Sequence, residues 1–528
     1  MNIRGQAIRN PAPIGVGLFV IAMVIAWILG DRIVANDTKT LIFAALGFTA
    51  CAIVVAVLRN WRTGFYLFLV WMVFEDLVRK YMGNNLALFF GKDVLLIFVY
   101  IALFLEIRRG KETPFRPPFL IPLSLFFWLA VLQVFNWNSP SFVYGLLGLK
   151  IYFFYVPLIF VGYALIRTDQ DLTKFLTVNA IVGAVVAAIG IAQGIVGSSF
   201  MNPAHLDPDL QGLGDLHKVD PTTNQVFYLP DSVFVSSGRY AVYLLILGIL
   251  LMGATAYLLL FTAKHRKISF AVLGIVGVAA VLSGSRTALV GIGASACFLT
   301  AGFLWGAPRR WNQAHKLVRA IRRSAIVMGV SVAVLLFFFP HEAGSRIGFF
   351  SETLTPGYGS NQLGDRTWDY PLANLFAVFD QPNWVVGNGT GTNSLGIQYV
   401  SKLVGARPLA MGVEEGYGSL ILEMGVIAPF LWIAWTASLL YYSWKVTRSL
   451  RETRFFPIAF AITWYAFVLL YPLTYLGLAP YQNYTCNIFL WLLVGVLFRL
   501  PEVLTCSQSP VIAYSAPRAV NVSVGAQI

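Results

Sequence analysis

The chain of 528 residues is 58% hydrophobic and only 12% charged, with a mean hydropathy of +0.71 and a formal net charge of +14. A soluble protein carries roughly 25% charged residues, so this composition excludes a water-soluble enzyme, a disordered chain and a disulfide scaffold. The positive charge does not indicate nucleic acid as a partner, because Lys and Arg collect in the cytoplasmic loops of membrane proteins.

Long apolar runs recur along the chain and predict an all-α polytopic membrane protein. A membrane β-barrel is excluded, because its strands would alternate polar and apolar residues. We expect about fourteen transmembrane helices, of which the third, ninth and eleventh are short. They cover 14–30, 41–58, 64–78, 86–105, 119–135, 150–166, 174–197, 239–261, 268–283, 287–305, 325–339, 416–444, 456–472 and 484–499.

The basic residues indicate how these helices are oriented. If both termini are cytoplasmic, every strongly basic loop lies on the inner side, as the positive-inside rule requires. We therefore expect a transmembrane helical bundle over 1–500 and a flexible cytoplasmic tail over 501–528. Two long loops then face outward: 198–238, and the larger, partly helical 340–415 between helices 11 and 12. Because function concentrates in long ordered loops, we expect it on the outer face.

No metal or other cofactor is expected from the sequence. The four cysteines lack metal-ligand spacing, so we expect neither a zinc site nor a disulfide. Asp207-Pro208-Asp209 in the first outer loop has the form of an Asp-x-Asp metal motif. A proline between two aspartates favours a solvated turn, and we prefer that interpretation.

Ser283-Gly284-Ser285-Arg286 joins the ninth and tenth predicted helices at the outer edge of the membrane. Arg286 has two possible roles. It could extend to the interface as an anchor, since an arginine inside hydrocarbon costs roughly 2.5–3.5 kcal/mol. Alternatively it could bind an anion, because a guanidinium pairs bidentately with phosphate oxygens, and Ser283 and Ser285 could add hydrogen bonds.

The second outer loop contains an apolar helical pattern. Trp368, Leu372, Leu375, Phe376 and Phe379 fall on one face of a helix from about 365 to 380. Pro371 should start its regular part or kink it. This face could pack on the bundle mouth, lie on the bilayer or stack on sugar rings. Farther along, Gly387-Asn388-Gly389-Thr390-Gly391 predicts a tight turn, since no strand and helix flank it as in a phosphate-binding loop.

Glu414 and Glu415 end this loop, where the twelfth helix begins. Carboxylates are stabilised at a helix N-terminus by the helix dipole, and this alone could explain them. A carboxylate at the mouth of a bundle, facing arginines, could also act as a catalytic acid or base. Glu423, one or two turns deeper, shares these alternatives.

Three motifs within 270–430 resemble the O-antigen ligase and O-antigen polymerase superfamily. They are Ser283-Gly284-Ser285-Arg286, Arg366…Trp368…Gln381-Pro382…Gly387-Asn388-Gly389, and Glu414-Glu415-Gly416-Tyr417…Leu420…Glu423-Met424-Gly425-Val426. The resemblance implies an inverting, metal-independent glycosyltransferase of a bacterial cytoplasmic (inner) membrane. Such proteins move a glycan from a polyprenyl-diphosphate-linked oligosaccharide donor onto a glycan acceptor outside that membrane. The bilayer, a flippase and a chain-length regulator are the further partners it implies.

The resemblance also implies roles for individual residues. Arg286 and Arg366 would hold the diphosphate, with Arg239 and Lys150 as helpers at outer helix ends, and Trp368 would contact substrate. Ligases of this family place His-Asn where this chain has Val413-Glu414-Glu415-Gly416-Tyr417, so the exopolysaccharide polymerase branch is favoured over a ligase. The identity of the base stays open between Glu414 and Glu415, with His341 as a weaker candidate.

Two other classes compete with this interpretation. A polysaccharide or lipid transporter, or a flippase, would place ionisable residues and broken helices near the membrane midplane. Here the ionisable residues lie mostly at the ends of the predicted helices, and no inverted repeat is found. A rhomboid-like protease is suggested by Gly293-Ala294-Ser295-Ala296, but none of the five histidines lies inside a predicted helix.

Overall fold

The computed structural model describes Thr49 and residues 51–83, 86–203, 217–219, 226–261, 266–306, 311–354, 364–405 and 412–508. These residues are almost entirely helical, with a single two-stranded sheet among them. The chain divides into two compact units: Met1–Leu69 with Gly91–Arg109, and Val70–Phe90 with Gly110–Ile528. Every residue proposed for the site from the sequence belongs to the second unit. The predicted helix at 14–30 lies outside the described residues.

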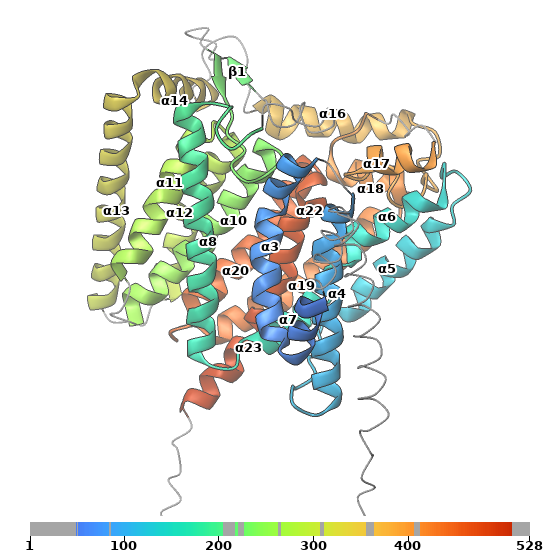
Figure 1. Ribbon diagram of the computed structural model, residues 1–528, viewed down its shortest axis with the longest axis horizontal. Helices are drawn as coiled ribbons and strands as arrows, with labels where there is room; N and C mark the ends of the chain where they lie inside the picture. Colours follow the sequence, from blue (N-terminus) through green and yellow to red (C-terminus); the bar gives the residue numbers. More distant parts are fainter. Residues whose placement is uncertain are drawn as a thin grey trace, which may run out of the picture. The chain divides into compact units, whose positions relative to one another are not determined.

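The helices up to the first long loop follow the predicted apolar runs (Figure 1). They are α3 (Trp61–Met82), α4 (Leu86–Arg108), α5 (Leu120–Val134), α6 (Phe142–Phe153), α7 (Leu158–Leu165) and α8 (Asp169–Val196). α8 begins with a capping box, in which Thr168 and Asp171 exchange side-chain and backbone hydrogen bonds.

Four helices lie between the two long loops. They are α10 (Ser237–Phe261), α11 (Arg266–Leu282), α12 (Arg286–Gly306) and α13 (Trp311–Phe338). The last helices are α18 (Gly416–Met424), α19 (Ala428–Ser449), α20 (Phe456–Val468), α21 (Thr474–Leu476), α22 (Ala479–Gln482) and α23 (Tyr484–Gln508), with a π-helical turn η3 (Leu469–Leu473) after α20.

Seven helical segments among the described residues are long and apolar enough to cross a membrane. They are Leu88–Arg108, Phe142–Leu165, Asp169–Val196, Ser237–Leu259, Arg286–Gly306, Phe456–Leu476 and Tyr484–Thr505. This number supports a multi-pass membrane protein. α7 and α23 pack with their backbones close together, because a Cβ on Gly162 would lie 2.1 Å from the Leu492 carbonyl oxygen and one on Gly495 equally close to that of Ile159.

Three predicted helices are interrupted. The run at 150–166 contains a turn that ends at Pro157, between α6 and α7. The run at 416–444 breaks at Gly425, whose φ of +82° ends α18. The run at 456–472 passes into η3, which contains Pro472, a residue that removes a helical hydrogen bond.

The first outer loop contains a short hairpin and a buried segment. β1 (His217–Val219) pairs antiparallel with β2 (Val226–Tyr228), and His217 lies opposite Tyr228. Residues 229–235, which follow β2, are buried. Asp207-Pro208-Asp209 lies outside the described residues.

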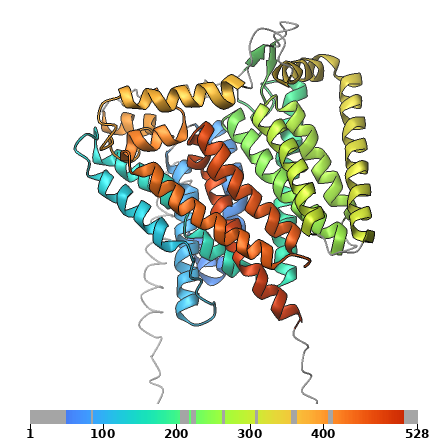
Figure 2. The same cartoon turned by 180° about the vertical axis from the view of Figure 1, so that it is seen from behind.

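The described part of the second outer loop is partly helical, as predicted. It comprises α14 (Pro340–Leu354), the π-helical turn η1 (Asp365–Asp369), α16 (Tyr370–Ala377), the 3-10 turn η2 (Val378–Asp380) and α17 (Ile397–Val404). The helix predicted at about 365–380 is confirmed as the continuous series η1, α16 and η2, with Pro371 in the first turn of α16. α16 lies across the same end of the second unit as β1 and α14 (Figures 1 and 2).

Candidate functional site

Arg239 and Arg286 occupy the first turns of two neighbouring helices. Arg286 is the first residue of α12, and Arg239 follows Ser237 at the start of α10. The two helices meet in a buried cluster of Ala241, Ala280 and Ala288. Because each arginine lies two residues before one of these alanines, both helices begin side by side at the same end. Two helix N-termini, each with a partial positive charge, therefore accompany the two guanidiniums.

Arg286 stacks on an aromatic ring together with a lysine. Its guanidinium carbon lies 4.4 Å from the centre of the Phe349 ring in α14, and the Lys218 ammonium of β1 lies 4.7 Å from the same ring. Cations are attracted to the face of an aromatic ring. The β-hairpin and α14 thus gather two positive charges beside the start of α12.

Ser283 and Ser285 build the turn that presents Arg286. The Ser283 hydroxyl donates to the carbonyl oxygen of Ala280 at 2.7 Å and accepts from the Ser285 amide at 3.2 Å. Gly284 has a φ of +62°, and a Cβ there would lie 2.6 Å from the side chain of Leu229. Because Ser283 is buried and its hydroxyl is engaged in the turn, its part is to shape the loop.

Arg346 was not singled out from the sequence. Its side chain is only 1% exposed, and its guanidinium donates to the carbonyl oxygens of Tyr228 at 2.9 Å, Gly194 at 3.3 Å and Glu342. Desolvation lowers the pKa of this guanidinium to about 10, and the Glu342 carboxylate opposes that shift. Arg346 thereby joins α14 to β2 and to the end of α8. No sequence pattern indicates such carbonyl partners.

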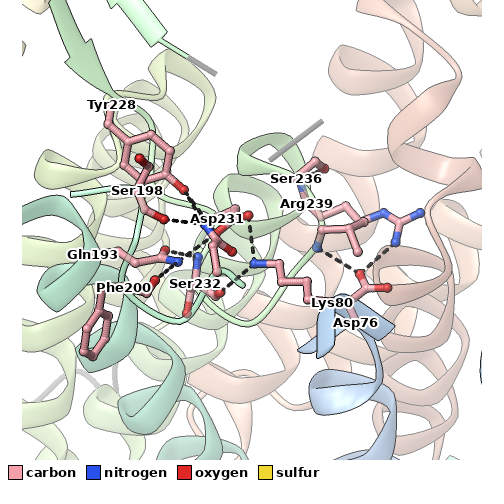
Figure 3. A network of polar contacts seen from close by, with 12 residues as sticks. Asp76, Lys80, Gln193, Ser198, Phe200, Tyr228, Asp231, Ser232, Ser236 and Arg239 are labelled. Atoms are coloured by element: carbon pink, nitrogen blue, oxygen red, sulfur yellow. Dashed lines mark hydrogen bonds and ion pairs between the residues drawn. The ribbon is translucent and has the colours of Figure 1, made fainter. Parts of the chain in front are cut away.

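Asp76 brings Arg239 together with Arg79. Its carboxylate lies 2.8 Å from Arg239 (Figure 3). The same carboxylate lies 2.9 Å from Arg79 and accepts a longer hydrogen bond from the amide of Val235. The Arg79 guanidinium carbon lies 5.0 Å from the Phe89 ring, and the Lys150 ammonium lies 4.5 Å from the same ring. Lys150, Arg79 and Arg239, which come from three different helices, therefore belong to one connected group.

A buried ion pair lies next to this group. The Lys80 ammonium is 2.8 Å from the Asp231 carboxylate, and both side chains are almost fully buried. Gln193 donates to Asp231 and accepts from the amide of Ser232, so that 231–232 is fixed to α8 (Figure 3). Burial raises the pKa of the Asp231 carboxyl, and the charge of Lys80 opposes this shift.

Tyr228 connects Arg346 with the ion pair of Lys80 and Asp231. Its carbonyl oxygen accepts the hydrogen bond from Arg346, and its hydroxyl donates to Asp231 at 3.4 Å. The segment 226–232 is thus held from one side by α14 and from the other by α3.

Arg366 and Trp368 lie in η1 at the start of the α16 helix. The side chain of Arg366 lies outside the described residues. The Trp368 ring packs edge-to-face on Tyr475, with centroids 6.2 Å apart, but Trp368 is largely exposed. Of the alternatives for the predicted apolar face, packing on the bundle mouth does not apply to Leu372, Phe376 and Phe379, which are exposed too. The inward side of the helix is formed by Pro371, Val378 and, in part, Leu375.

Glu415 and Glu414 differ sharply in their surroundings. Glu415 is 1% exposed and caps the N-terminus of α18, accepting hydrogen bonds from the amides of Tyr417 and Gly418. Burial raises the pKa of this carboxyl to about 7, even though the two hydrogen bonds favour the charged form. The Glu414 side chain is exposed, and its backbone amide donates to Asn374 of α16 at 3.3 Å.

One short segment runs from Glu415 to Arg239. A Cβ on Gly416 would lie 1.8 Å from the carbonyl oxygen of Thr474, so the start of α18 touches α21. Ten residues later the chain reaches Tyr484, whose ring centre lies 5.3 Å from the guanidinium carbon of Arg239. The capping carboxylate and the arginine are therefore attached to the two ends of 474–484.

Glu423 is a structural carboxylate. It is fully buried and accepts four hydrogen bonds, from Tyr152 at 2.8 Å, the Ser394 hydroxyl at 2.7 Å, and the amides of Asn393 at 3.0 Å and Gly391 at 3.2 Å. The suggestion that it faces arginines at the bundle mouth is wrong, because its partners are neutral donors. The tight turn predicted at 387–391 is found only in part: a turn closes from the Thr392 amide to the Gly389 carbonyl oxygen, with Gly391 at a φ of +85°, whereas the amides of Asn388 and Gly389 donate to 422–423.

No protein-family model, curated protein or solved structure matches this chain.

Proposed function

We propose that this protein is a membrane glycosyltransferase that polymerises polyprenyl-diphosphate-linked oligosaccharide units on the outer face of a bacterial inner membrane. In this proposal it belongs to the O-antigen ligase and polymerase superfamily, with about fourteen transmembrane helices and both termini in the cytoplasm. One observation carries the proposal: Arg239 and Arg286 begin adjoining helices that pack through Ala241 and Ala288.

A diphosphate fits this arrangement chemically. Helix N-termini attract anions, and guanidinium groups form paired hydrogen bonds with phosphate oxygens. In the reaction, an acceptor hydroxyl attacks the anomeric carbon of the donor, the new C–O bond forms, and the bond to the diphosphate oxygen breaks. The electron pair leaves with the diphosphate, whose added charge positioned cations stabilise. Arg239 and Arg286 supply two of these cations, with Lys150, Arg79 and Lys218 close to them.

The acceptor proton requires a base, and Glu415 suits that role better than Glu414. A general base works best when its pKa lies near the operating pH. Burial raises the pKa of Glu415 to about 7, whereas the Glu414 side chain is exposed to solvent. The proton from the attacking hydroxyl would pass to the Glu415 carboxylate, which the segment 474–484 connects to Arg239.

The test is an assay of purified protein in liposomes with a polyprenyl-diphosphate-linked oligosaccharide, with and without chelator. We expect a ladder of products that chelator does not change. Arg286→Ala should lower the rate by roughly 100- to 1,000-fold, the loss typical of one removed charge-stabilising donor, and Arg286→Lys should recover part of it. Arg451→Ala, which removes a guanidinium stacked on Trp305, is the matched control and should keep the wild-type rate.

Other outcomes would identify a different protein. A single transfer onto a non-repeating acceptor would indicate a ligase. Passage of the lipid-linked glycan across the membrane without a new glycosidic bond would indicate a flippase. Normal polymer length in Arg286→Ala would refute the role of that arginine.

A further inference from the structure

The continuous helix of η1, α16 and η2 carries exposed apolar side chains that the described part of the chain covers only in part, through Tyr475 and Trp384. Trp368, Leu372, Phe376 and Phe379, here called the apolar stripe, are all exposed, and Phe376 is 64% exposed. Exposed aromatic residues in such a row mark an interaction surface. The side of the helix that faces the protein is formed instead by Pro371 and Val378, so the stripe is not part of the core.

The stripe continues into a second exposed apolar surface. Phe379 packs edge-to-face on Trp384, with ring centres 5.0 Å apart, and the next two residues, Val385 and Val386, are exposed. The carbonyl oxygen of Val386 accepts a hydrogen bond from Gln133 at 2.7 Å. Gln133 lies in the last turn of α5, so the end of the stripe is fixed to the connection between α5 and α6 (Figures 1 and 2).

That connection also carries exposed aromatic side chains. Residues 135–142, here called the hairpin tip, include Phe135, Trp137 and Phe142, and the tryptophan is 84% exposed. A loop surrounded by water would not place three aromatic residues in this way. Phe142 also begins Phe142–Leu165, one of the segments long and apolar enough to cross a membrane. The hairpin tip therefore lies at the end of a membrane-spanning segment.

The length of α5 supports the same position. It has 15 residues, which corresponds to about 22 Å of helix, whereas the hydrocarbon core of a bilayer is about 30 Å thick. An apolar helix of this length does not carry its end beyond the headgroups. The hairpin tip, and Val386 with it, is then at the level of the membrane surface.

We propose that the bilayer is the occupant of this surface: α16 lies flat at the membrane–water boundary, with the apolar stripe between headgroups and acyl chains, beside the hairpin tip. Tryptophan and other aromatic residues favour this boundary, and helices with one apolar face lie in its plane. Asp369 and Asp380 are exposed on the same helix, so apolar burial, and not attraction to anionic headgroups, holds it there. This inference does not depend on the proposed enzymatic activity.

The experiment compares two neighbouring positions on α16. Phe376 and Ala377 are both exposed, yet they point about 100° apart around the helix. With the native cysteines replaced, a nitroxide label is attached at Phe376→Cys or Ala377→Cys in the full chain, in phosphatidylcholine nanodiscs. Collision rates with apolar oxygen and with a water-soluble nickel chelate are then measured. We expect oxygen collisions to dominate at 376 and nickel collisions at 377, with Trp137→Cys behaving like 376.

Two results would overturn the inference. Equal access of the nickel chelate to both labels would show that the stripe faces water. Shielding of 376 from both reagents would show that protein, a second copy or another partner, covers it. If the cysteine-free chain does not fold, a photoreactive phenylalanine analogue at 376 or 377 replaces the labels; it should cross-link lipid from 376 only, and equal cross-linking would contradict the proposal.

Discussion

Two buried carboxylates in the second unit have opposite surroundings. Asp231 is paired with Lys80 at 2.8 Å and also accepts from Gln193, whereas Glu415 accepts two backbone amides and forms no ion pair with any described residue. A buried acid paired with a cation holds two segments of the chain together, because removing either charge leaves the other buried without a counter-charge. A buried acid held only by amides keeps a pKa near neutrality, which suits proton transfer.

The largest effect is expected when the ion pair is broken. Asp231→Asn leaves the Lys80 ammonium buried without its counter-charge, and we expect a loss of about 3–5 kcal/mol in the free energy of unfolding. Thermal unfolding in a fixed detergent, followed by intrinsic fluorescence, measures it. If the variant unfolds at the wild-type temperature, the pair does not hold α3 to 231–232.

Asp169→Asn is the matched control. Asp169 faces Arg454 at 3.5 Å, and both side chains are roughly one-third exposed. Exposed pairs contribute about 0–1 kcal/mol, and asparagine keeps an acceptor for the Tyr257 hydroxyl. A loss of unfolding free energy as large as that of Asp231→Asn would mean that burial does not explain the difference in strength between the two ion pairs.

The second prediction concerns pH and Glu415. Its pKa is about 7 in the folded protein and near 4.5 in the unfolded chain, so the folded state binds the proton more tightly. The resulting stability is complete below pH 4.5 and is lost as the pH rises through 7. Since one pKa unit corresponds to about 1.4 kcal/mol, the loss between pH 5 and 8.5 reaches at most about 3 kcal/mol.

The measurement compares wild type with Glu415→Gln over this pH range. Glutamine keeps one oxygen, which can accept from one of the two amides that bond to separate oxygens of Glu415, so part of the helix cap survives while the titration disappears. The difference between the two unfolding temperatures should change with pH, in favour of the variant at pH 8.5. A constant difference would contradict the raised pKa.

Catalysis gives the third prediction. If Glu415 accepts the proton of the acceptor hydroxyl, Glu415→Gln should slow glycan transfer on the order of 100-fold, the lower end of what general bases contribute. The wild-type rate should rise with pH through about 7, because only the deprotonated carboxyl acts as a base. The variant should lose this rise. Retention of the same pH profile in Glu415→Gln would remove the carboxylate from the mechanism.

Much of this fold is predictable from the sequence, because hydrophobic length alone locates α8, α10 and α12 to within a few residues. The interruptions of the helices are harder to predict from the sequence. The turn that ends at Pro157 and the π-helical turn containing Pro472 both lie inside runs that remain apolar throughout. The position of these two turns depends on packing against other helices, and a hydropathy pattern carries no information about that packing.

The candidate site likewise has features that the sequence predicts and features that it does not. The turn at Ser283–Arg286 and the carboxylates at the start of α18 could be selected by residue type and place. The distant partners of Arg346 and Lys80 could not, because the carbonyl oxygens of Gly194 and Tyr228 and the acid Asp231 lie more than a hundred residues away in sequence. Such pairs are fixed only when the outer loops fold onto the helices.

The smallest effect is expected at Glu414, which the sequence does not distinguish from Glu415. Its side chain is exposed, and its backbone amide donates to Asn374. Glu414→Gln preserves that amide and removes a charge that water already solvates, so we expect less than about 0.5 kcal/mol in unfolding and a transfer rate within about twofold of wild type. The assay is run beside Glu415→Gln under identical conditions. A loss at 414 equal to that at 415 would mean that the charge of the whole helix start, and not one buried carboxyl, matters for transfer.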